Sequence, residues 1–168
     1  MQSKARLLGH PIHQMLIVFP LGLLTTSLIF DVIGGISHHG IWNFIAFYMI
    51  GAGIFGGVVA GAFGLVDWVV IPRRTRAKLV GLQHAIANVV ALVIFAASWV
   101  MRLDAPHIPG RMAILVSAVG VAVAGLGGWL GGELVNRFGV GVHEGAHLNS
   151  PGSLSGRPAS DDAGPGPA

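Results

Sequence analysis

The sequence predicts an all-α membrane protein, folded as an up-down bundle of four transmembrane helices, and two observations lead to that class. Only 10% of the 168 residues are charged and 53% are apolar, whereas an average soluble domain carries about 25% charged residues. The apolar residues also fall into four long runs, and about 20 apolar residues are enough to cross the hydrocarbon core as a helix. A chain with so few charges cannot cover a globular surface in water.

The predicted spans are residues 14–36, 41–68, 79–101 and 112–132. Each run is rich in Leu, Ala, Met and Gly and lacks the two-residue alternation of a half-buried strand. A segment inside a bilayer must satisfy its own backbone polar groups, which favours helices over open strands. The first run is too long for the core of a cleaved signal peptide, so we expect it to remain as a span.

Basic residues lie mostly on the side of the bundle that holds both chain ends. That side carries most of the Lys and Arg residues next to the spans, namely Lys4, Arg6, Arg73, Arg74, Arg76, Lys78 and Arg137. The opposite loops carry only Arg102 and Arg111. Because Lys and Arg accumulate in cytoplasmic loops, we predict a multi-pass protein of the bacterial inner membrane with both termini in the cytoplasm. The basic segment 72–78 is interpreted as a contact for lipid headgroups, and no nucleic acid is expected as a partner.

The composition of the chain changes at about residue 148. From there to residue 168 the chain consists mostly of Pro, Gly, Ser, Ala and Asp. Such residues cannot bury enough apolar area to offset the entropy of the chain. We therefore divide the sequence into a transmembrane domain, residues 1–147, and a disordered tail, residues 148–168.

Small residues recur every four positions in two of the predicted helices, a spacing that lets membrane helices approach closely. They are Gly53, Gly57 and Gly61 in the second helix and Gly120, Ala124, Gly128 and Gly132 in the fourth. We interpret both sets as packing surfaces. The further set Gly125, Gly127 and Gly131 favours either a central position for the fourth helix or a contact with a partner, such as a second copy of the chain.

The two halves of the chain also look faintly alike. His10 and His84 lie near the start of the first and third helices, whereas Asp67 and Glu133 lie near the ends of the second and fourth. This pattern suggests a duplicated hairpin about an axis along the membrane normal, as in some transporters.

Two histidines stand directly before the first span, in the segment GHPIHQ. Pro11 suits the first position of a helix, because its missing N–H would have no partner there. We therefore expect His10 at the N-cap and His13 in the first turn. His84 is expected about one turn into the third helix, on the same side of the membrane. These histidines thus gather at one depth, which a random distribution would not produce.

Two kinds of cofactor fit such a set of side chains. Imidazole and carboxylate groups bind divalent transition metal ions, and the candidate ligands are His10, His13, His84, Asp67 and Glu133. Alternatively, two imidazoles from different helices bind haem b from opposite faces. The best pair is then His84 with His10 or His13, because His84 lies deepest in an apolar helix, where a polar group is costly and points to a function. With no cysteine in the chain, thiolate metal sites and c-type haem are excluded.

The remaining polar residues have simpler interpretations. For Asp67 and Glu133, the alternative to binding a metal ion is an ion pair with Arg73, Arg74 or Arg137. Asp31, inside the first span, is expected to reach the interface, to pair with Arg102 or Arg111, or to relay protons. His143 and His147 are weaker candidates in a glycine-rich stretch, and solvated loop residues are expected at His38, His39 and His107.

Four blocks of the sequence together resemble one family: GHPIHQML, FGLVDWVVIP, VGLQHAIANVVALVIFAASW and GGWLGGELVNRFGVGV. The resemblance covers residues 7–143 and is to a widespread family of predicted bacterial membrane proteins known only as a domain of unknown function. The family's opening motif usually reads G-H-P-x-H-P, and Gln14 stands here in place of the second proline. Some members are fused to Rieske or c-type cytochrome domains, so the resemblance implies a role in electron transfer.

Three functions remain open from the sequence. The first is a redox accessory protein that holds haem b or a metal ion near the cytoplasmic face, with redox proteins or a membrane complex as partners. The second is a cofactor-free structural or assembly subunit, held to its partners by the glycine surfaces. The third is a small transporter. The sequence contains none of the common catalytic motifs of soluble enzymes.

Overall fold

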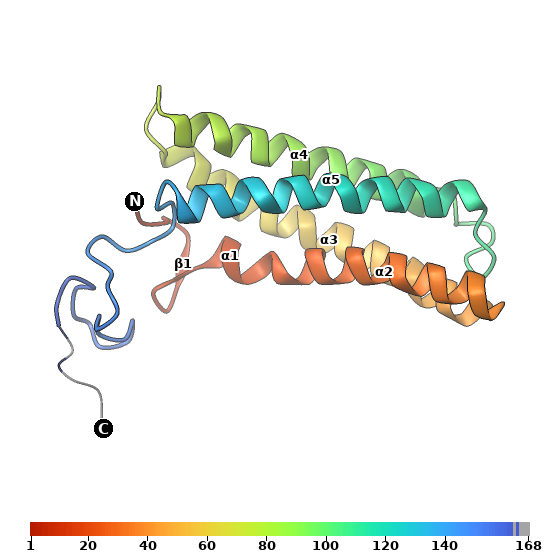
Figure 1. The fold of residues 1–168 in the computed structure, drawn as a ribbon, viewed down its shortest axis with the longest axis horizontal. Coiled ribbons are helices and arrows are strands. Elements are labelled where there is room, and N and C mark those ends of the chain that lie inside the picture. The colour runs from red at the N-terminus through yellow and green to blue at the C-terminus, as the bar shows by residue number, and fades with distance from the viewer. Residues whose placement is uncertain (163, 165–168) are drawn as a thin grey trace.

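The computed structural model of the chain describes residues 1–162 and residue 164, and long helices make up most of it (Figure 1). The elements are β1 (Arg6–Leu7), β2 (His10–Pro11), α1 (Ile12–Leu16), α2 (Val18–Ser37), α3 (Gly40–Val70), α4 (Arg76–Val100) and α5 (Arg111–Asn136). α1 and α2 together form one span, so the chain has four helical segments long and apolar enough to cross a membrane. The predicted four-helix membrane bundle is confirmed.

The helices extend further at their polar ends than hydropathy indicated. α4 begins at Arg76, because the side chain of Thr75 caps it by accepting a hydrogen bond from the backbone N–H of Lys78. α5 continues to Asn136 through residues that are polar but still form helices well. At the other end of the chain, the N-cap of α1 is Pro11 and not His10 as predicted.

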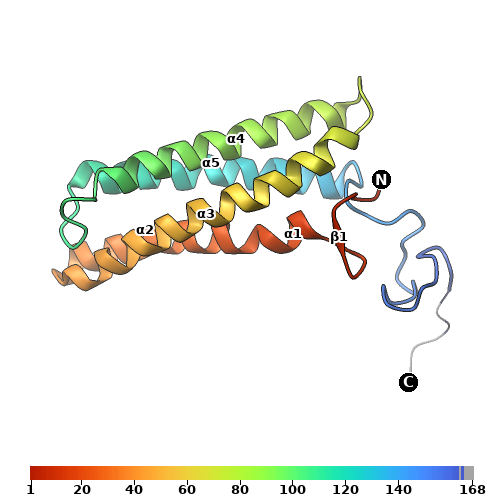
Figure 2. The same ribbon diagram turned by 180° about the vertical axis from the view of Figure 1, so that it is seen from behind.

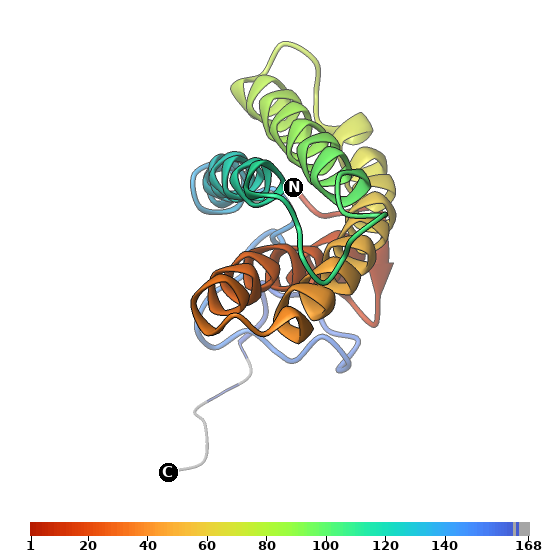
Figure 3. The same ribbon diagram turned by 90° about the vertical axis from the view of Figure 1, so that its right-hand side faces the viewer.

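The four spans form two antiparallel hairpins, α2 with α3 and α4 with α5, which lie side by side (Figures 1 and 2). Viewed along the bundle, the spans follow one another around it in chain order, so that α2 lies diagonally opposite α4 (Figure 3). Both chain ends lie at one end of the bundle, which we call the terminal end. There the N-terminal ammonium of Met1 donates a hydrogen bond to the carbonyl of Gly139 at 3.0 Å. The turn between α2 and α3 and the loop between α4 and α5 form the opposite, distal end.

The buried core is small and lies mid-bundle, where Leu24, Ile50 and Phe95 pack together. Large apolar side chains are exposed over the outside of all four spans, among them Phe19, Phe55, Val93 and Leu126. Such a surface would be unfavourable in water, whereas lipid tails solvate it well. The described residues therefore have the inside-out polarity of a protein embedded in a bilayer.

The first helices of the two hairpins bury equivalent positions. Asp31 and Arg102 lie 71 residues apart, and the same separation relates the buried side chains in the middle of α2 to buried side chains of α4 and of the turn that follows it. The pairs are Pro20 with Ala91, Leu24 with Phe95, Ser27 with Ser98, and Asp31 with Arg102. The two hairpins are thus repeats of one unit, as the sequence faintly suggested.

The second helices of the hairpins repeat in the same way. A constant separation relates four of the buried positions of α3 to four of α5, namely Ala46 to Ala113, Ile50 to Ser117, Gly53 to Gly120, and Ala60 to Gly127. A side chain at Gly53 would strike Leu24, and one at Gly120 would strike Phe95, its repeat equivalent. The structure therefore has an approximate two-fold axis along the bundle, between the diagonal helices α2 and α4.

Beyond Asn136 the described chain runs in turns, without helix or strand, so His143 and His147 do not share a helical face. The disorder of residues 148–168 stays a prediction, and residues 163 and 165–168 of that tail lie outside the described residues. The expected central position of the fourth helix is wrong, since α5 packs mainly against α4 and only loosely against α2.

Candidate functional site

Two imidazoles meet inside the terminal half of the bundle. The ring centroids of His13, on α1, and His84, on α4, are 6.2 Å apart, and the ring planes are perpendicular, at 89°. Both side chains are half-buried. The two residues are also separated by the same 71 positions as Asp31 and Arg102. They are therefore equivalent positions of the two repeats and meet across the two-fold axis. This corrects the repeat correspondence, for which the sequence had suggested His10 and His84.

Each imidazole is fixed by a backbone carbonyl of the next helix. Nδ1 of His13 donates to the carbonyl of Ala60 on α3 at 2.8 Å, and Nδ1 of His84 donates to the carbonyl of Gly127 on α5 at 2.8 Å. A carbonyl oxygen can only accept, so the proton of each neutral ring lies on Nδ1. The Nε2 atom of each ring then carries the free lone pair, which is the atom a metal centre binds.

A glycine lies one helical turn after each of these carbonyls and leaves room for the ring. A Cβ at Gly64 would lie 2.9 Å from Nδ1 of His13, and a Cβ at Gly131 would lie 3.1 Å from Cε1 of His84. Gly64 and Gly131 occupy the same place in the two repeats. Each repeat therefore contains a glycine that leaves room for an imidazole, Gly64 in the segment FGLVDW and Gly131 in the segment GGWLGGE.

Asn88 completes the surroundings of His84, and the sequence analysis missed it. Its Nδ2 donates to the backbone carbonyl of His84 at 2.8 Å and lies 3.4 Å from Nε2 of the ring. Gly127 makes this possible, because a Cβ there would lie 2.8 Å from the amide of Asn88. The spacing of four residues between His84 and Asn88, on one helical face, was the signal that could have indicated this contact.

His10 does not lie with the other two histidines as expected. Leu8 and Gly9 both have positive φ, 50° and 86°, and close a two-residue hairpin turn between β1 and β2. His10 therefore belongs to a strand, is exposed, and has its Nε2 3.3 Å from the hydroxyl of Ser153. The glycine before His10 decides this, because it permits a turn where the sequence suggested a helix start.

Asp67 holds the N-terminal segment, residues 3–5, against the end of α3. Its Oδ1 accepts hydrogen bonds from the hydroxyl of Ser3 at 2.6 Å, the N–H of Lys4 at 3.0 Å and the N–H of Ala5 at 3.4 Å. Glu133 is half-buried on α5. Within the described residues, neither carboxylate forms the ion pair with Arg73, Arg74 or Arg137 that was the alternative prediction.

We expect Asp67→Ala to release the N-terminal segment, because three donors lose one charged acceptor. Hydrogen bonds to charged groups contribute about 1.5–3 kcal/mol, so the backbone amides of Lys4 and Ala5 should exchange with solvent at least about tenfold faster. Hydrogen–deuterium exchange of the purified protein measures this, with Glu133→Ala as the matched control. Equal exchange in wild type and Asp67→Ala would show that other contacts hold the segment.

A second polar pair lies on the same axis in the distal half of the bundle. Arg102 donates to both carboxylate oxygens of Asp31, at 2.7 and 2.8 Å, and both side chains are fully buried. Arg102 also donates to the hydroxyls of Ser98 and Ser117, at 3.2 and 3.1 Å. Of the alternatives for Asp31, the ion pair with Arg102 is the one found. Arg102 lies in the turn after α4, outside the helix as the sequence predicted, but it is fully buried.

The five residues predicted for a metal ion therefore separate into two groups. The structure brings His13 and His84 together, whereas His10 and Asp67 contact other partners and Glu133 lies half-buried on α5, apart from the histidine pair. Among the residues that the structure describes, no group of three or more His, Asp or Glu side chains is arranged to hold an ion. What the arrangement offers chemically is a pair of oriented imidazoles, with Nε2 of His84 lying 3.4 Å from Nδ2 of Asn88.

A family model matches most of the chain. The family is described as a predicted membrane protein, DUF2231, and the match covers residues 9–144. The chain belongs to this family. The matched DUF2231 region holds both hairpins and therefore His13, His84 and their carbonyl acceptors. The resemblance seen in the four sequence blocks is confirmed, whereas the implied role in electron transfer stays a prediction.

Two further comparisons returned no match to this DUF2231 chain. No curated protein is similar to it, and no solved structure is similar to it.

Proposed function

We propose that this DUF2231 protein is a redox accessory protein of the bacterial inner membrane that binds one haem b through His13 and His84. The observation that supports the proposal is the pair of imidazoles, each fixed through Nδ1 by a carbonyl at 2.8 Å. A histidine that binds a metal usually donates its other N–H in this way, which fixes the tautomer and makes the ligand more basic. Two such side chains, from different hairpins, lie 6.2 Å apart between ring centroids.

The separation of the rings also fits a shared metal centre. Imidazole nitrogens bind metals at about 2.0–2.1 Å, so the centroids of two rings on opposite sides of one metal lie about 6 Å apart. The observed separation is 6.2 Å. Because His13 and His84 come from different hairpins and their rings lie 6.2 Å apart, these two side chains would hold the group, which would supply the redox chemistry.

Haem b fits this pair better than a bare metal ion. Zinc and similar ions take three or four ligands from the protein, whereas a haem iron takes four nitrogens from the porphyrin and needs only two axial side chains. His10 and Asp67, which could have supplied further ligands, contact Ser153 and the N-terminal segment instead. When bound, haem b would supply a one-electron redox centre. The chain itself orients the two imidazoles and surrounds them with four helices in lipid.

The distribution of charge supports a site near the cytoplasmic face. The terminal end carries Arg73, Arg74, Arg76, Lys78 and Arg137. Since Arg102 is buried in an ion pair, only Arg111 remains as a basic residue of the distal loops. This strengthens the positive-inside bias, so both termini and the histidine pair belong on the cytoplasmic side, where soluble redox partners have access.

The proposal is tested on the full chain, produced in cells supplied with a haem precursor and purified in detergent. We expect a Soret band, about one haem b per chain, and no stoichiometric metal other than iron. His13→Ala and His84→Ala should lose the Soret band, whereas His10→Ala and His143→Ala should keep it. His84→Met should retain haem with a more positive reduction potential, because a Met/His pair raises the potential.

Circular dichroism separates loss of haem from loss of fold in these variants. Well-folded wild type without haem overturns the proposal, and so does a Soret band that survives His84→Ala. A stoichiometric metal ion without a Soret band, lost in His13→Ala, would favour the metal-ion form of the site.

A second candidate is a cofactor-free structural subunit of a membrane complex. It is favoured by Gly125 and Gly128, since a Cβ at either position would meet no atom within 4 Å. Helix glycines exposed to lipid cost stability without a packing gain, whereas a partner helix could approach them closely. Absence of haem and metal, together with a partner copurifying in fixed stoichiometry, would support this function.

A further inference from the structure

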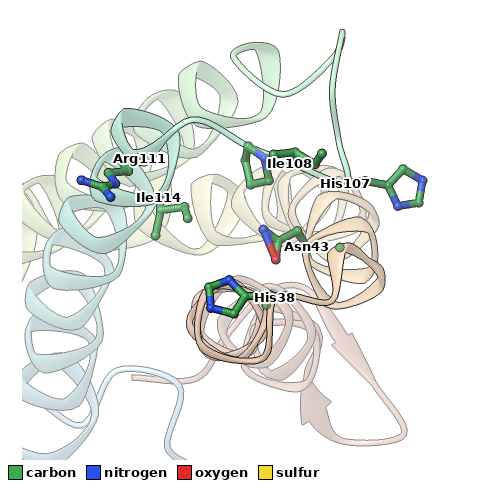
Figure 4. A pocket seen from close by; sticks show the side chains of 10 residues that line it. His38, Asn43, His107, Ile108, Arg111 and Ile114 are labelled. Atoms are coloured by element: carbon green, nitrogen blue, oxygen red, sulfur yellow. The ribbon is translucent and has the colours of Figure 1, made fainter.

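A cavity of about 450 Å³ lies at the distal end, away from the histidine pair. It lies between the end of α2, the first turns of α3 and α5, and the loop from α4 to α5 (Figure 4). Its walls are partly apolar, with Ile108, Pro109 and Ile114, and partly polar, with His38, Asn43 and Arg111. The volume is in the range of about 300–1,000 Å³ that small-molecule sites have.

The amide of Asn43 points into this cavity, between His38 and Ile108 (Figure 4). The residue is only 7% exposed, and its Oδ1 has no hydrogen-bond partner among the described residues. Gly34 lets the amide lie so deep, because a Cβ there would overlap it. An unsatisfied buried polar group costs about 1–3 kcal/mol. Because Oδ1 is an acceptor, only a donor, such as the hydroxyl of a protonated phosphate, would remove that cost.

The surroundings of the cavity are positively charged. Arg111 lines it, and α3 and α5 both begin beside it without a side-chain cap. Uncapped helix starts carry unpaired N–H groups and a partial positive charge, and both attract anions. Of the described acidic residues at this end, Asp31 is neutralised by Arg102, which leaves Asp104 in the exposed loop.

We infer that the distal cavity binds a phosphate-class anion, held by the charge of Arg111, the two helix starts and the amide of Asn43. The Nδ2 atom of the amide carries two donors, so Asn43 can donate to an anion. The apolar wall suits a phosphate that carries a hydrocarbon group at the membrane surface. The same chemistry is found in the headgroup of an anionic phospholipid and in free phosphate.

The test uses the full chain in nanodiscs of phosphatidylcholine, titrated with inorganic phosphate, and in nanodiscs that also contain phosphatidylglycerol. Binding is followed by calorimetry for phosphate, and by native mass spectrometry of retained lipid. Stabilisation by phosphate in phosphatidylcholine assigns the free anion, whereas retention of phosphatidylglycerol alone assigns the lipid headgroup. If neither phosphate nor phosphatidylglycerol is bound, the inference is overturned.

Three variants locate the binding. Arg111→Gln should weaken it at least tenfold, and Asn43→Leu should abolish it. Arg73→Gln, which removes the same charge at the terminal end, should leave it unchanged. Asn43→Leu is expected to fold at least as well as wild type, because an apolar side chain of similar size replaces an unsatisfied amide. Anion binding that survives Asn43→Leu, or that falls equally in Arg73→Gln, excludes this cavity as the site.

Discussion

Replacing Arg102 with methionine is expected to lower the free energy of unfolding by about 3–5 kcal/mol, the usual cost of leaving one charge of a buried pair without its partner. Asp31 would then lie fully buried between α2 and α4, with no water to solvate its carboxylate. The hydroxyls of Ser98 and Ser117 would also lose the guanidinium that each of them contacts. A change of this size is a large fraction of the stability of most proteins.

The double variant Asp31→Leu/Arg102→Met distinguishes the cost of an isolated charge from the value of the pair. Apolar side chains of similar volume often replace a buried ion pair at little cost, so the double variant should recover most of the loss. Unfolding in mixed detergent micelles, followed by circular dichroism, measures all three stabilities. If Arg102→Met has the same free energy of unfolding as wild type, the ion pair between Arg102 and Asp31 does not stabilise the distal half of the bundle.

Hydropathy was sufficient to predict the spans, because burial of apolar residues in lipid depends on composition and length. It was insufficient for Arg102. The predicted third span ended at residue 101, close to the observed end of α4 at Val100, but the burial of Arg102 in the turn that follows was not predicted. Its partner Asp31 lies 71 residues away on another helix. The sequence offered this pair as one of several alternatives for Asp31, and only the packed helices decide among them.

The histidines show the same limit at shorter range. The sequence predicted that His84 would lie near an N-terminal imidazole, and the structure brings it to His13, at 6.2 Å between centroids. It could not choose between His10 and His13, since three residues separate them and only the turn at Leu8 and Gly9 decides which one enters the bundle. The carbonyls of Ala60 and Gly127 were not predictable, because every residue carries a carbonyl.

Only part of the glycine ridge predicted for α5 faces the bundle, since Gly120 packs against Phe95 but Gly128 does not meet a neighbouring helix. A spacing of four predicted a ridge through Gly120, Gly128 and Gly132, whereas a Cβ at Gly127 or Gly131 would strike α4 and one at Gly128 would meet nothing within 4 Å. Gly127 and Gly128 are neighbours, so their directions differ by about 100° around the helix. Both sets have the spacing that helix contact requires, and only the packed structure determines which set faces the bundle.

Gly120 and Gly128 provide a matched pair of sites for the last prediction. We expect Gly120→Leu to lower the free energy of unfolding by about 1–3 kcal/mol or more, the cost of overpacking a close contact. A Cβ at Gly120 would lie 2.9 Å from Cε2 of Phe95, in the buried core. Gly128→Leu, two turns further along α5, should instead raise stability by up to about 1 kcal/mol, because glycine is a poor helix former.

The same two variants test whether the chain binds a second copy of itself through α5. Replacing a small residue in a contact between membrane helices keeps their backbones apart. If α5 forms such a contact at Gly128, the leucine variant will be folded and monomeric where wild type is oligomeric, as measured by light scattering in detergent. If both proteins have the same oligomeric state, the glycines on this face have no partner helix. Unfolding of Gly128→Leu as severe as that of Gly120→Leu would mean that Gly128 lies inside the bundle, which contradicts the packing of α5 described above.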